Sequence, residues 1–231
     1  YTCAGESDPL PPLAIQYGDY AYWQQNKDDG DKLVQQQDYW AKQLADAPAV
    51  HSLPLARPRP DVKQHQGASI SGQLPAQITE SLMELAKRYQ LTPFMLLHGA
   101  LSLLLSRHSY SHDIVVGIPV ANRLRTELAP LIGFFVNTLV LRADTRHEDL
   151  ANYFSHIQQV HLQAQSHQDI TFDQIVDRLN IPRSAAHSPL FQIMMRVNSD
   201  YGVSPNNTAN APERPLDGVK FSPDNSDYLS A

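Results

Sequence analysis

His167, Gln168 and Asp169 have the most suggestive spacing for proton-transfer chemistry in this chain, and they lie between two expected helices. A histidine and an aspartate two positions apart can act as a general base and its orienting group, but only if their side chains converge. The simpler interpretation is a turn between helices. Asp169 would then lie near the next helix N-terminus, where the helix dipole favours a negative charge. The sequence favours the turn.

Other reactive patterns in the sequence are weak. Among ten histidines, only His108 and His112, followed by Asp113, have the spacing of metal ligands. No third ligand is close in sequence, so a solvated polar turn is a better interpretation than a metal site. The single cysteine, Cys3, excludes an internal disulfide, fits a reducing compartment and has no basic neighbour to activate its thiol. Glycine-rich phosphate loops and a GxSxG motif are absent from the sequence.

Asn137 is the anomalous residue of the apolar segment Leu131–Arg142, which reads LIGFFVNTLVLR. This segment predicts a strand that is buried on both faces. A buried carboxamide without partners costs about 1–3 kcal/mol, so its hydrogen bonds must be satisfied. Two interpretations remain open: the amide ties down a neighbouring loop, or it lines a cleft and faces a substrate.

Composition narrows the possible classes of protein. The chain has 231 residues, 42% of them hydrophobic, with a net charge of −6. It has no run of lysine and arginine, so nucleic acid is not an expected partner. It also lacks an apolar stretch of membrane-spanning length and a signal-peptide pattern, so we expect no membrane association and a cytoplasmic location.

Periodicity and punctuation predict a layered α/β unit over residues 14–231, after a proline-rich linker at residues 1–13. The expected sheet is mixed and flanked by helices. Thr92, followed by Pro93, is the expected N-cap of a buried helix, and Thr171 is a second candidate cap. Helices are expected at 15–25, 32–44, 76–89, 92–108, 148–165 and 171–179, and strands at 67–74, 113–121, 131–142 and 189–197.

Five motifs follow one another along this chain. They are YGDYAYWQ at Tyr17–Gln24, GIPVANR at Gly117–Arg123, IGFFVNTLVLR at Ile132–Arg142, HQDITFDQIVD at His167–Asp177 and SPLFQIMM at Ser188–Met195. Together they resemble the downstream signatures of nonribosomal peptide synthetase condensation domains, YxDYAxWQ, IGxFVNTxxxR and HQDxPFE among them. The resemblance covers roughly residues 10–200.

The chain departs from the family pattern at several positions. Thr171 replaces the usual proline, Asp173 replaces glutamate, and Arg183–Leu190 reads RSAAHSPL where the family has RDxSxNPL. The catalytic motif HHxxxDG does not occur in the sequence. By resemblance, the chain is therefore the C-terminal half of a chloramphenicol-acetyltransferase-like condensation domain. The general base would lie on the N-terminal half, and the final strands would also be missing.

The resemblance also implies roles for individual residues. Residues 121–130 correspond to the floor loop beneath the substrate tunnel, and residues 201–218 to the latch that reaches the other half. The substrate channel would be lined by Asn137, Gly133 and Phe135. The interface between the halves would involve Tyr17, Asp19, Arg123, His167, Gln168 and Asp169. No catalytic residue and no metal ligand is expected in this chain.

The expected function is amide-bond formation between aminoacyl or peptidyl thioesters. Each thioester would be held on the phosphopantetheine arm of a donor or acceptor peptidyl carrier protein, and no cofactor would be bound directly. The expected partners are these carrier proteins, the N-terminal half of the domain and neighbouring synthetase domains. The chain alone would be inactive. Alternatives are a CoA-dependent acyltransferase of the same fold and a non-catalytic module that docks carrier proteins.

Overall fold

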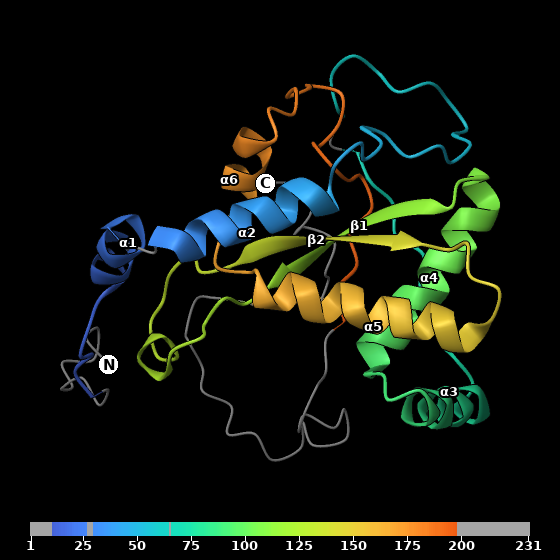
Figure 1. The fold of residues 1–231 in the computed structure, drawn as a ribbon, viewed down its shortest axis with the longest axis horizontal. Helices are drawn as coiled ribbons and strands as arrows, with labels where there is room; N and C mark the ends of the chain where they lie inside the picture. Colours follow the sequence, from blue (N-terminus) through green and yellow to red (C-terminus); the bar gives the residue numbers. More distant parts are fainter. Residues whose placement is uncertain (1–10, 27–29, 65, 198–231) are drawn as a thin grey trace, which may run out of the picture.

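The computed structural model describes residues 11–26, 30–64 and 66–197 (Figure 1). Cys3 and the expected latch, 201–218, lie outside the described residues. The helices are α1 Tyr17–Asn26, α2 Gly30–Gln43, α3 Ala76–Arg88, α4 Pro93–Ser109, α5 Leu150–Ser166 and α6 Phe172–Arg178. The strands are β1 Asp113–Val120 and β2 Asn137–Asp144, and a short 3₁₀ helix, Thr126–Leu128, lies in the connection between them.

The sheet in the described part of the chain consists of β1 and β2, which pair antiparallel from Asp113 opposite Asp144 to Val120 opposite Asn137. An isolated parallel bridge joins Gly117 to Met194. The α/β class predicted from the sequence is confirmed in this coarse form.

Three strand predictions need correction. The strand expected at 131–142 begins only at Asn137. The strand expected at 189–197 is reduced to the single bridge at Met194. Residues 67–74 form no strand, and the Ile70 side chain is fully exposed. Alternating apolar residues show that a segment can cover one face of a sheet, but a strand also needs a backbone partner. No described segment pairs with residues 67–74.

Capping side chains fix the starts of three helices. The Thr92 side chain accepts a hydrogen bond from Met95 N at the start of α4, as the sequence predicts. Thr171 forms a complete capping box with Gln174 at the start of α6. Asp149 caps α5 by accepting from Asn152 N. Each cap satisfies an amide that would otherwise lack a partner in the first helical turn.

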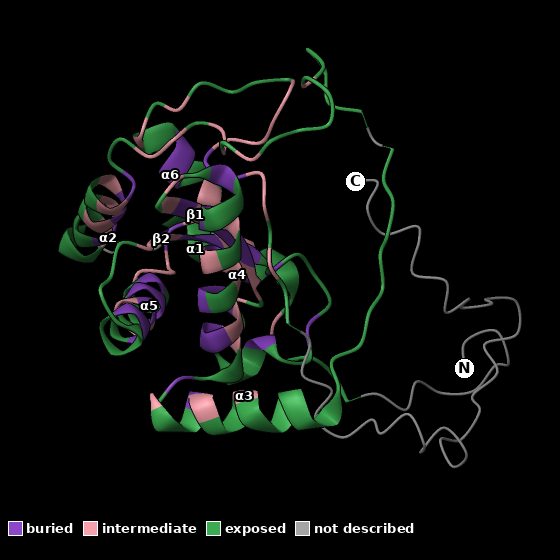
Figure 2. Cartoon of the chain, turned by 90° about the vertical axis from the view of Figure 1, so that its right-hand side faces the viewer, coloured by how far each residue is buried: buried purple, intermediate pink, exposed green. Residues whose placement is uncertain are grey.

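Helices cover the sheet through distinct apolar clusters. One cluster joins Trp40 of α2 to Leu139 of β2 and Ile175 of α6. A second joins α3, α4 and α5 around Ile157. In the cartoon of Figure 2, purple marks the buried residues of α4 and α5. A smaller cluster, which contains Tyr20, joins α1 to the β1–β2 connection. The α5–α6 turn lies between α2 and the start of β2.

Candidate functional site

The α5–α6 turn, residues 167–172, is anchored to β2 by the Asn137 side chain. Its Nδ2 donates to Gln168 O at 3.2 Å and to Ile170 O at 2.9 Å. Its Oδ1 accepts from Phe172 N at 3.1 Å and from Thr138 N at 2.9 Å. The amide is therefore saturated by contacts within the chain. These contacts match the loop-tying interpretation of the Asn137 anomaly.

The same turn is held from the other side by α2. Gln36 Oε1 accepts from Asp169 N at 3.1 Å and Ile170 N at 3.2 Å, and the Gln36 side chain is only 3% exposed. Trp40 Nε1 donates to His167 O at 2.9 Å. Sequence reasoning missed Gln36, which lies in a run of three glutamines with no feature to single it out.

His167 and Asp169 make separate contacts. The His167 ring stacks on Tyr39, with 3.9 Å between ring centroids, and its Nδ1 lies 2.8 Å from Gln163 O. The Asp169 carboxylate forms an ion pair with Lys32 at 2.5 Å. These contacts fit the turn interpretation of the HQD motif.

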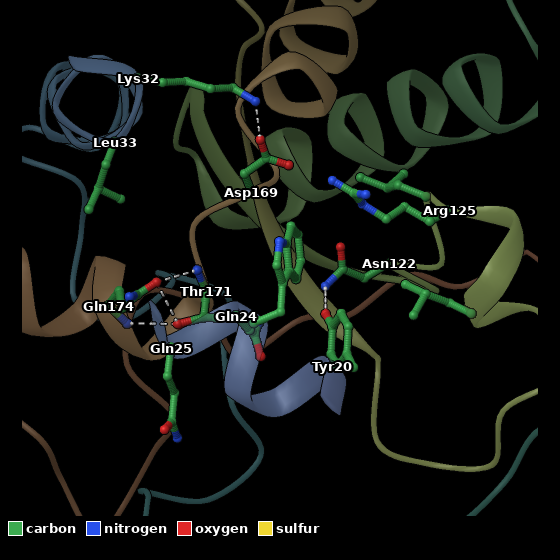
Figure 3. Close-up of a pocket in the computed structure, with 13 residues that line it drawn as sticks. Tyr20, Gln24, Gln25, Lys32, Leu33, Asn122, Arg125, Asp169, Thr171 and Gln174 are labelled. Atoms are coloured by element: carbon green, nitrogen blue, oxygen red, sulfur yellow. Dashed lines mark hydrogen bonds and ion pairs between the residues drawn. The ribbon is translucent and has the colours of Figure 1, made fainter. Parts of the chain in front are cut away.

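A pocket of about 810 Å³ opens beside this turn, between α1, α2, the β1–β2 connection and the start of α6 (Figure 3). Asp169 and Thr171 of the HQD motif line the pocket, together with Tyr20 of α1 and Asn122 of the β1–β2 connection. Asn122 Nδ2 donates a hydrogen bond to Tyr20 Oη at 3.4 Å. Residues from three of the five sequence motifs thus meet on one wall.

The pocket is lined by both polar and apolar side chains, and basic residues lie on two of its sides. The Arg125 guanidinium lies 4.7 Å from the centroid of the Trp23 ring, a cation–π arrangement. Lys32 approaches from α2, where it pairs with Asp169. Among the site residues predicted from the sequence, only Asp169 lines this pocket in the described part of the chain.

Gly133 and Phe135, which the sequence resemblance places in the substrate channel, contact Tyr17 of α1. Tyr17 Oη donates to Phe134 O at 3.0 Å. A Cβ at Gly133 would lie closer than 3.0 Å to the Tyr17 ring, so this close approach requires glycine. The Tyr17 ring meets Phe135 edge-on, with centroids 5.3 Å apart. Asp19 Oδ2 accepts from Gln16 N at 2.8 Å, at the start of α1.

Arg123 also makes contacts within the chain. Its guanidinium lies 4.2 Å from the Phe135 ring centroid and donates to Leu128 O.

Three apolar side chains between residues 132 and 136 are exposed, which the sequence did not predict. Ile132 is 95% exposed, Phe134 is 78% exposed, and Val136 is half exposed. We call these three residues the 132–136 ridge. The sequence LIGFFV is apolar at alternate positions on both sides and therefore predicts burial on both faces, whereas the structure buries Leu131 and Phe135 and exposes the ridge.

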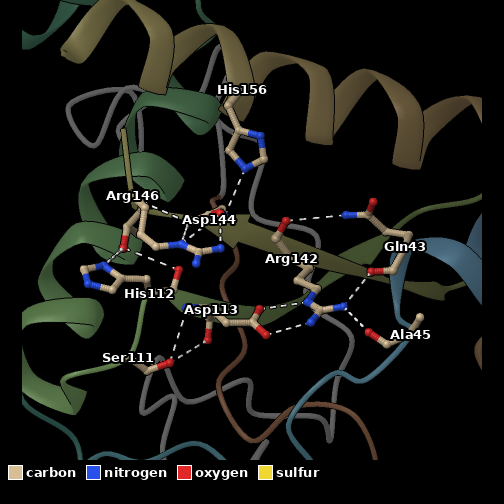
Figure 4. A network of polar contacts seen from close by, with 10 residues as sticks. Gln43, Ala45, Ser111, His112, Asp113, Arg142, Asp144, Arg146 and His156 are labelled. Carbon is tan, nitrogen blue, oxygen red and sulfur yellow. Dashed lines mark hydrogen bonds and ion pairs between the residues drawn. The ribbon is translucent and has the colours of Figure 1, made fainter. Parts of the chain in front are cut away.

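The arginine that ends the IGFFVNTLVLR motif joins the sheet to α2 (Figure 4). Arg142 Nε and Nη2 donate to the two oxygens of Asp113 at 2.8 and 2.7 Å. Its Nη1 donates to Gln43 O and Ala45 O at the end of α2. The hydrogen bonds to Asp113 raise the Arg142 pKa. Asp113, part of the possible metal pattern, is thus used in an ion pair.

Two further groups of charged or titratable residues lie away from the pocket. Hydrogen bonds from Arg146 lower the Asp144 pKa to about 2. His98 of α4 and His161 of α5 are fully buried and lie 3.0 Å apart, Nδ1 to Nε2. Burial lowers the pKa of His98 to about 3 and that of His161 to about 4, so both rings are neutral.

Metal-binding and membrane-spanning features are absent from the described residues. These residues contain no group of three or more histidine, cysteine, aspartate or glutamate side chains that could hold a metal ion. None of their helices combines the length and apolar character needed to cross a membrane.

Comparison with known sequences gives a consistent result. A family model described as Condensation domain matches residues 1–228. Malpinin synthetase of Mortierella alpina is 42% identical over 193 residues, which are 83% of this chain and 2% of that protein. Phosphinothricin tripeptide synthetase PhsC of Streptomyces viridochromogenes is 39% identical over 214 residues, 92% of this chain and 20% of that protein. The chain spans a small part of these relatives.

Solved structures show the same relationship. The X-domain from teicoplanin biosynthesis aligns with a TM-score of 0.77 and 26% identity, over 84% of this chain and 44% of that one. A four-domain nonribosomal peptide synthetase bound to AMP and glycine aligns with a TM-score of 0.75 and 33% identity, over 82% of this chain and 14% of that one. The chain therefore belongs to the condensation-domain family, in the form found in nonribosomal peptide synthetases.

Proposed function

We propose that this chain supplies the C-terminal half of a condensation domain that joins carrier-bound aminoacyl or peptidyl thioesters through an amide bond. The observation that carries the proposal is the pocket beside the α5–α6 turn. Its walls combine residues of YGDYAYWQ, GIPVANR and HQDITFDQIVD, three motifs far apart in the sequence. Because the sequence has no HHxxxDG motif, the N-terminal half would supply the general base, and this chain alone would be inactive.

Amide formation between tethered reactants depends chiefly on placement. Attack of an amine on a thioester is accelerated when both groups are held in line, because the entropic cost of a bimolecular encounter has already been met. In this proposal the chain forms one wall of the passage into which both phosphopantetheine arms reach. A pocket of about 810 Å³ has room for part of a tethered substrate.

The predicted site residues act in this proposal by shaping the wall. Asn137 fixes the α5–α6 turn and the start of α6 through three hydrogen bonds. Gly133, Phe135 and Tyr17 fix α1 against the β1–β2 connection. Asp169 is the predicted residue that faces the pocket.

The 132–136 ridge supports a partner surface for the other half. Ile132 and Phe134 are largely exposed, whereas Leu131 and Phe135 beside them are buried. Exposed apolar side chains grouped in this way are typical of surfaces that a partner covers. In the proposal, the N-terminal half of the domain covers this ridge, and donor and acceptor peptidyl carrier proteins approach from either side.

Reconstitution of the domain tests the proposed function. A condensation domain containing this chain and its N-terminal half is mixed with an aminoacyl donor carrier and an aminoacyl acceptor carrier, and the dipeptidyl carrier is measured by mass spectrometry. We expect the dipeptide on the acceptor carrier with the complete domain, and none with this chain alone.

Two outcomes would overturn the proposal. Transfer from acyl-CoA with no donor carrier would identify a CoA-dependent acyltransferase instead. Binding of carriers by the complete domain without any coupling, over a range of loaded amino acids, would identify a docking module.

A further inference from the structure

We propose that one face of α2, formed by Lys32, Gln36 and Trp40, positions the α5–α6 turn at the pocket, with Gln36 as its central positioning residue. These three side chains are spaced four residues apart, so they lie above one another on the same side of the helix. All three contact the turn. The inference rests on the proposed function, because it concerns the same pocket.

The three side chains of α2 contact different parts of the turn. Trp40 Nε1 binds His167 O at 2.9 Å, where α5 ends. Gln36 Oε1 binds Asp169 N and Ile170 N, two successive amides, at 3.1 and 3.2 Å. Lys32 pairs with the Asp169 carboxylate, 2.5 Å away at the pocket. The helix thus contacts the turn at three of its residues, His167, Asp169 and Ile170.

Gln36 differs from its two neighbours in this face. Lys32 is largely exposed at the pocket, and Trp40 is packed in the apolar core. Gln36 is buried, and it meets the turn through a polar atom. Asn137 holds the Ile170 carbonyl from the opposite side. With Ile170 N and O held by two different carboxamides, the backbone beside Asp169 cannot rotate without breaking buried hydrogen bonds.

Substitution of Gln36 has a local and a functional consequence. Leucine keeps the size of the side chain but removes the acceptor, which leaves two backbone amides without their partner. The turn would then sample orientations that carry Asp169 away from the pocket. The inference assigns the turn to the pocket and not to carrier docking, so the carrier protein should still dock. We therefore expect the turnover number of coupling, kcat, to fall while KM for the carrier changes little.

Hydrogen exchange and coupling kinetics test the proposal together. In the 231-residue chain with Gln36→Leu, we expect the Asp169 and Ile170 amides to exchange at least about tenfold faster than in the unchanged chain. In the reconstituted domain, we expect kcat to fall between about tenfold and hundredfold, with KM for the acceptor carrier within about threefold.

Two companion variants complete the design. Gln36→Glu retains an oxygen that can accept from both amides, so we expect it to restore slow exchange and most of kcat. Gln35→Leu makes the same chemical change on the exposed side of α2 and should alter neither measurement. Should Gln36→Leu not fold, Gln36→Asn withdraws the acceptor by one methylene group and carries the same expectation.

The outcomes separate this inference from the proposed function. Unchanged exchange at Asp169 and Ile170 in Gln36→Leu overturns the inference. Slow exchange in the Gln36→Glu variant supports it, because the carboxylate oxygen then takes the place of the amide acceptor. If the unchanged domain shows no coupling, the proposed function fails, and the exchange measurement still decides whether Gln36 holds the turn.

Discussion

The buried histidine pair makes the stability of this chain sensitive to mild acid. His98 and His161 are fully buried between α4 and α5, and burial lowers both pKa values from 6.5, to about 3 and about 4. The folded state therefore keeps both rings neutral, whereas the unfolded chain binds their protons as the pH falls below 6.5. Their contribution to stability is complete above pH 6.5 and decreases below it.

The magnitude follows from the shifted values. Each such histidine reduces the free energy of unfolding by about 1.4 kcal/mol per pH unit below 6.5, until its own folded-state pKa is reached. Between about pH 7.5 and about pH 5.0 this amounts to about 2 kcal/mol for each ring and about 4 kcal/mol for the pair. That is a large share of the roughly 5–15 kcal/mol that stabilises a typical domain.

The assay is urea unfolding at these two pH values. The comparison is between the unchanged chain and the double variant His98→Leu/His161→Leu, which replaces both polar rings with apolar side chains. We expect the unchanged chain to lose about 4 kcal/mol more than the double variant between the two pH values. His156, whose pKa burial also lowers, remains in both proteins and contributes equally.

A matched control uses the exposed His108 on α4. His108→Leu should leave the pH dependence of unfolding as it is in the unchanged chain. Equal losses of stability in the unchanged chain and the double variant would refute the reasoning. Protonation of Asp144 does not confuse the measurement, because its contribution is lost only as the pH falls from about 3.8 toward its folded pKa of about 2.

Three further predictions concern the packing of the site. Gly133→Ala places a methyl group against the Tyr17 ring and should detach α1, seen as faster proteolysis near residue 17 than in the unchanged chain. Arg142→Lys keeps the charge but loses the two-pronged contact with Asp113, and should cost about 1–3 kcal/mol in urea unfolding; an unchanged midpoint would contradict this. Asn137→Leu should destabilise by about 2 kcal/mol or more and speed amide exchange at 168–172, whereas an unaffected turn would show that these hydrogen bonds are not needed.

Local signals in the sequence were sufficient for the helices. The Thr92 cap followed by Pro93, and the Thr171 cap, mark helix starts that the structure confirms to within a residue. Such signals act over one helical turn, so a single sequence contains all of the necessary information. The family motifs likewise gave the correct family, because each motif is a local string.

The pairing of strands and the burial of apolar segments were not predictable from the sequence in the same way. Residues 67–74 alternate as a strand should, yet they have no partner among the described residues, and partner availability is not a local property. The apolar run at 131–136 predicted burial on both sides, whereas Ile132 and Phe134 are exposed. A pattern of apolar residues shows that a surface avoids water, but not which part of the molecule covers it.

The site illustrates the same limit at the level of single residues. Asn137 was recognisable as a polar residue inside an apolar segment, and both of its possible roles could be stated in advance. Gln36 could not be recognised, because Gln35 and Gln37 beside it have the same side chain. Only the fold shows that one of the three faces the turn.

The close packing of Gly133 on Tyr17 has a counterpart elsewhere in the described residues, and both contacts restrict how this domain can be recombined. Gly117 exchanges backbone hydrogen bonds with the segment around Phe191, and a Cβ at Gly117 would overlap the Phe191 ring. Gly133 accommodates Tyr17 in the same way. In a chimera built from two related synthetases, a crossover that falls between a glycine and the aromatic residue it contacts would take the glycine from one parent and the ring from the other. Chimeras that take both residues of each contact from the same parent should fold more often than chimeras that take them from different parents.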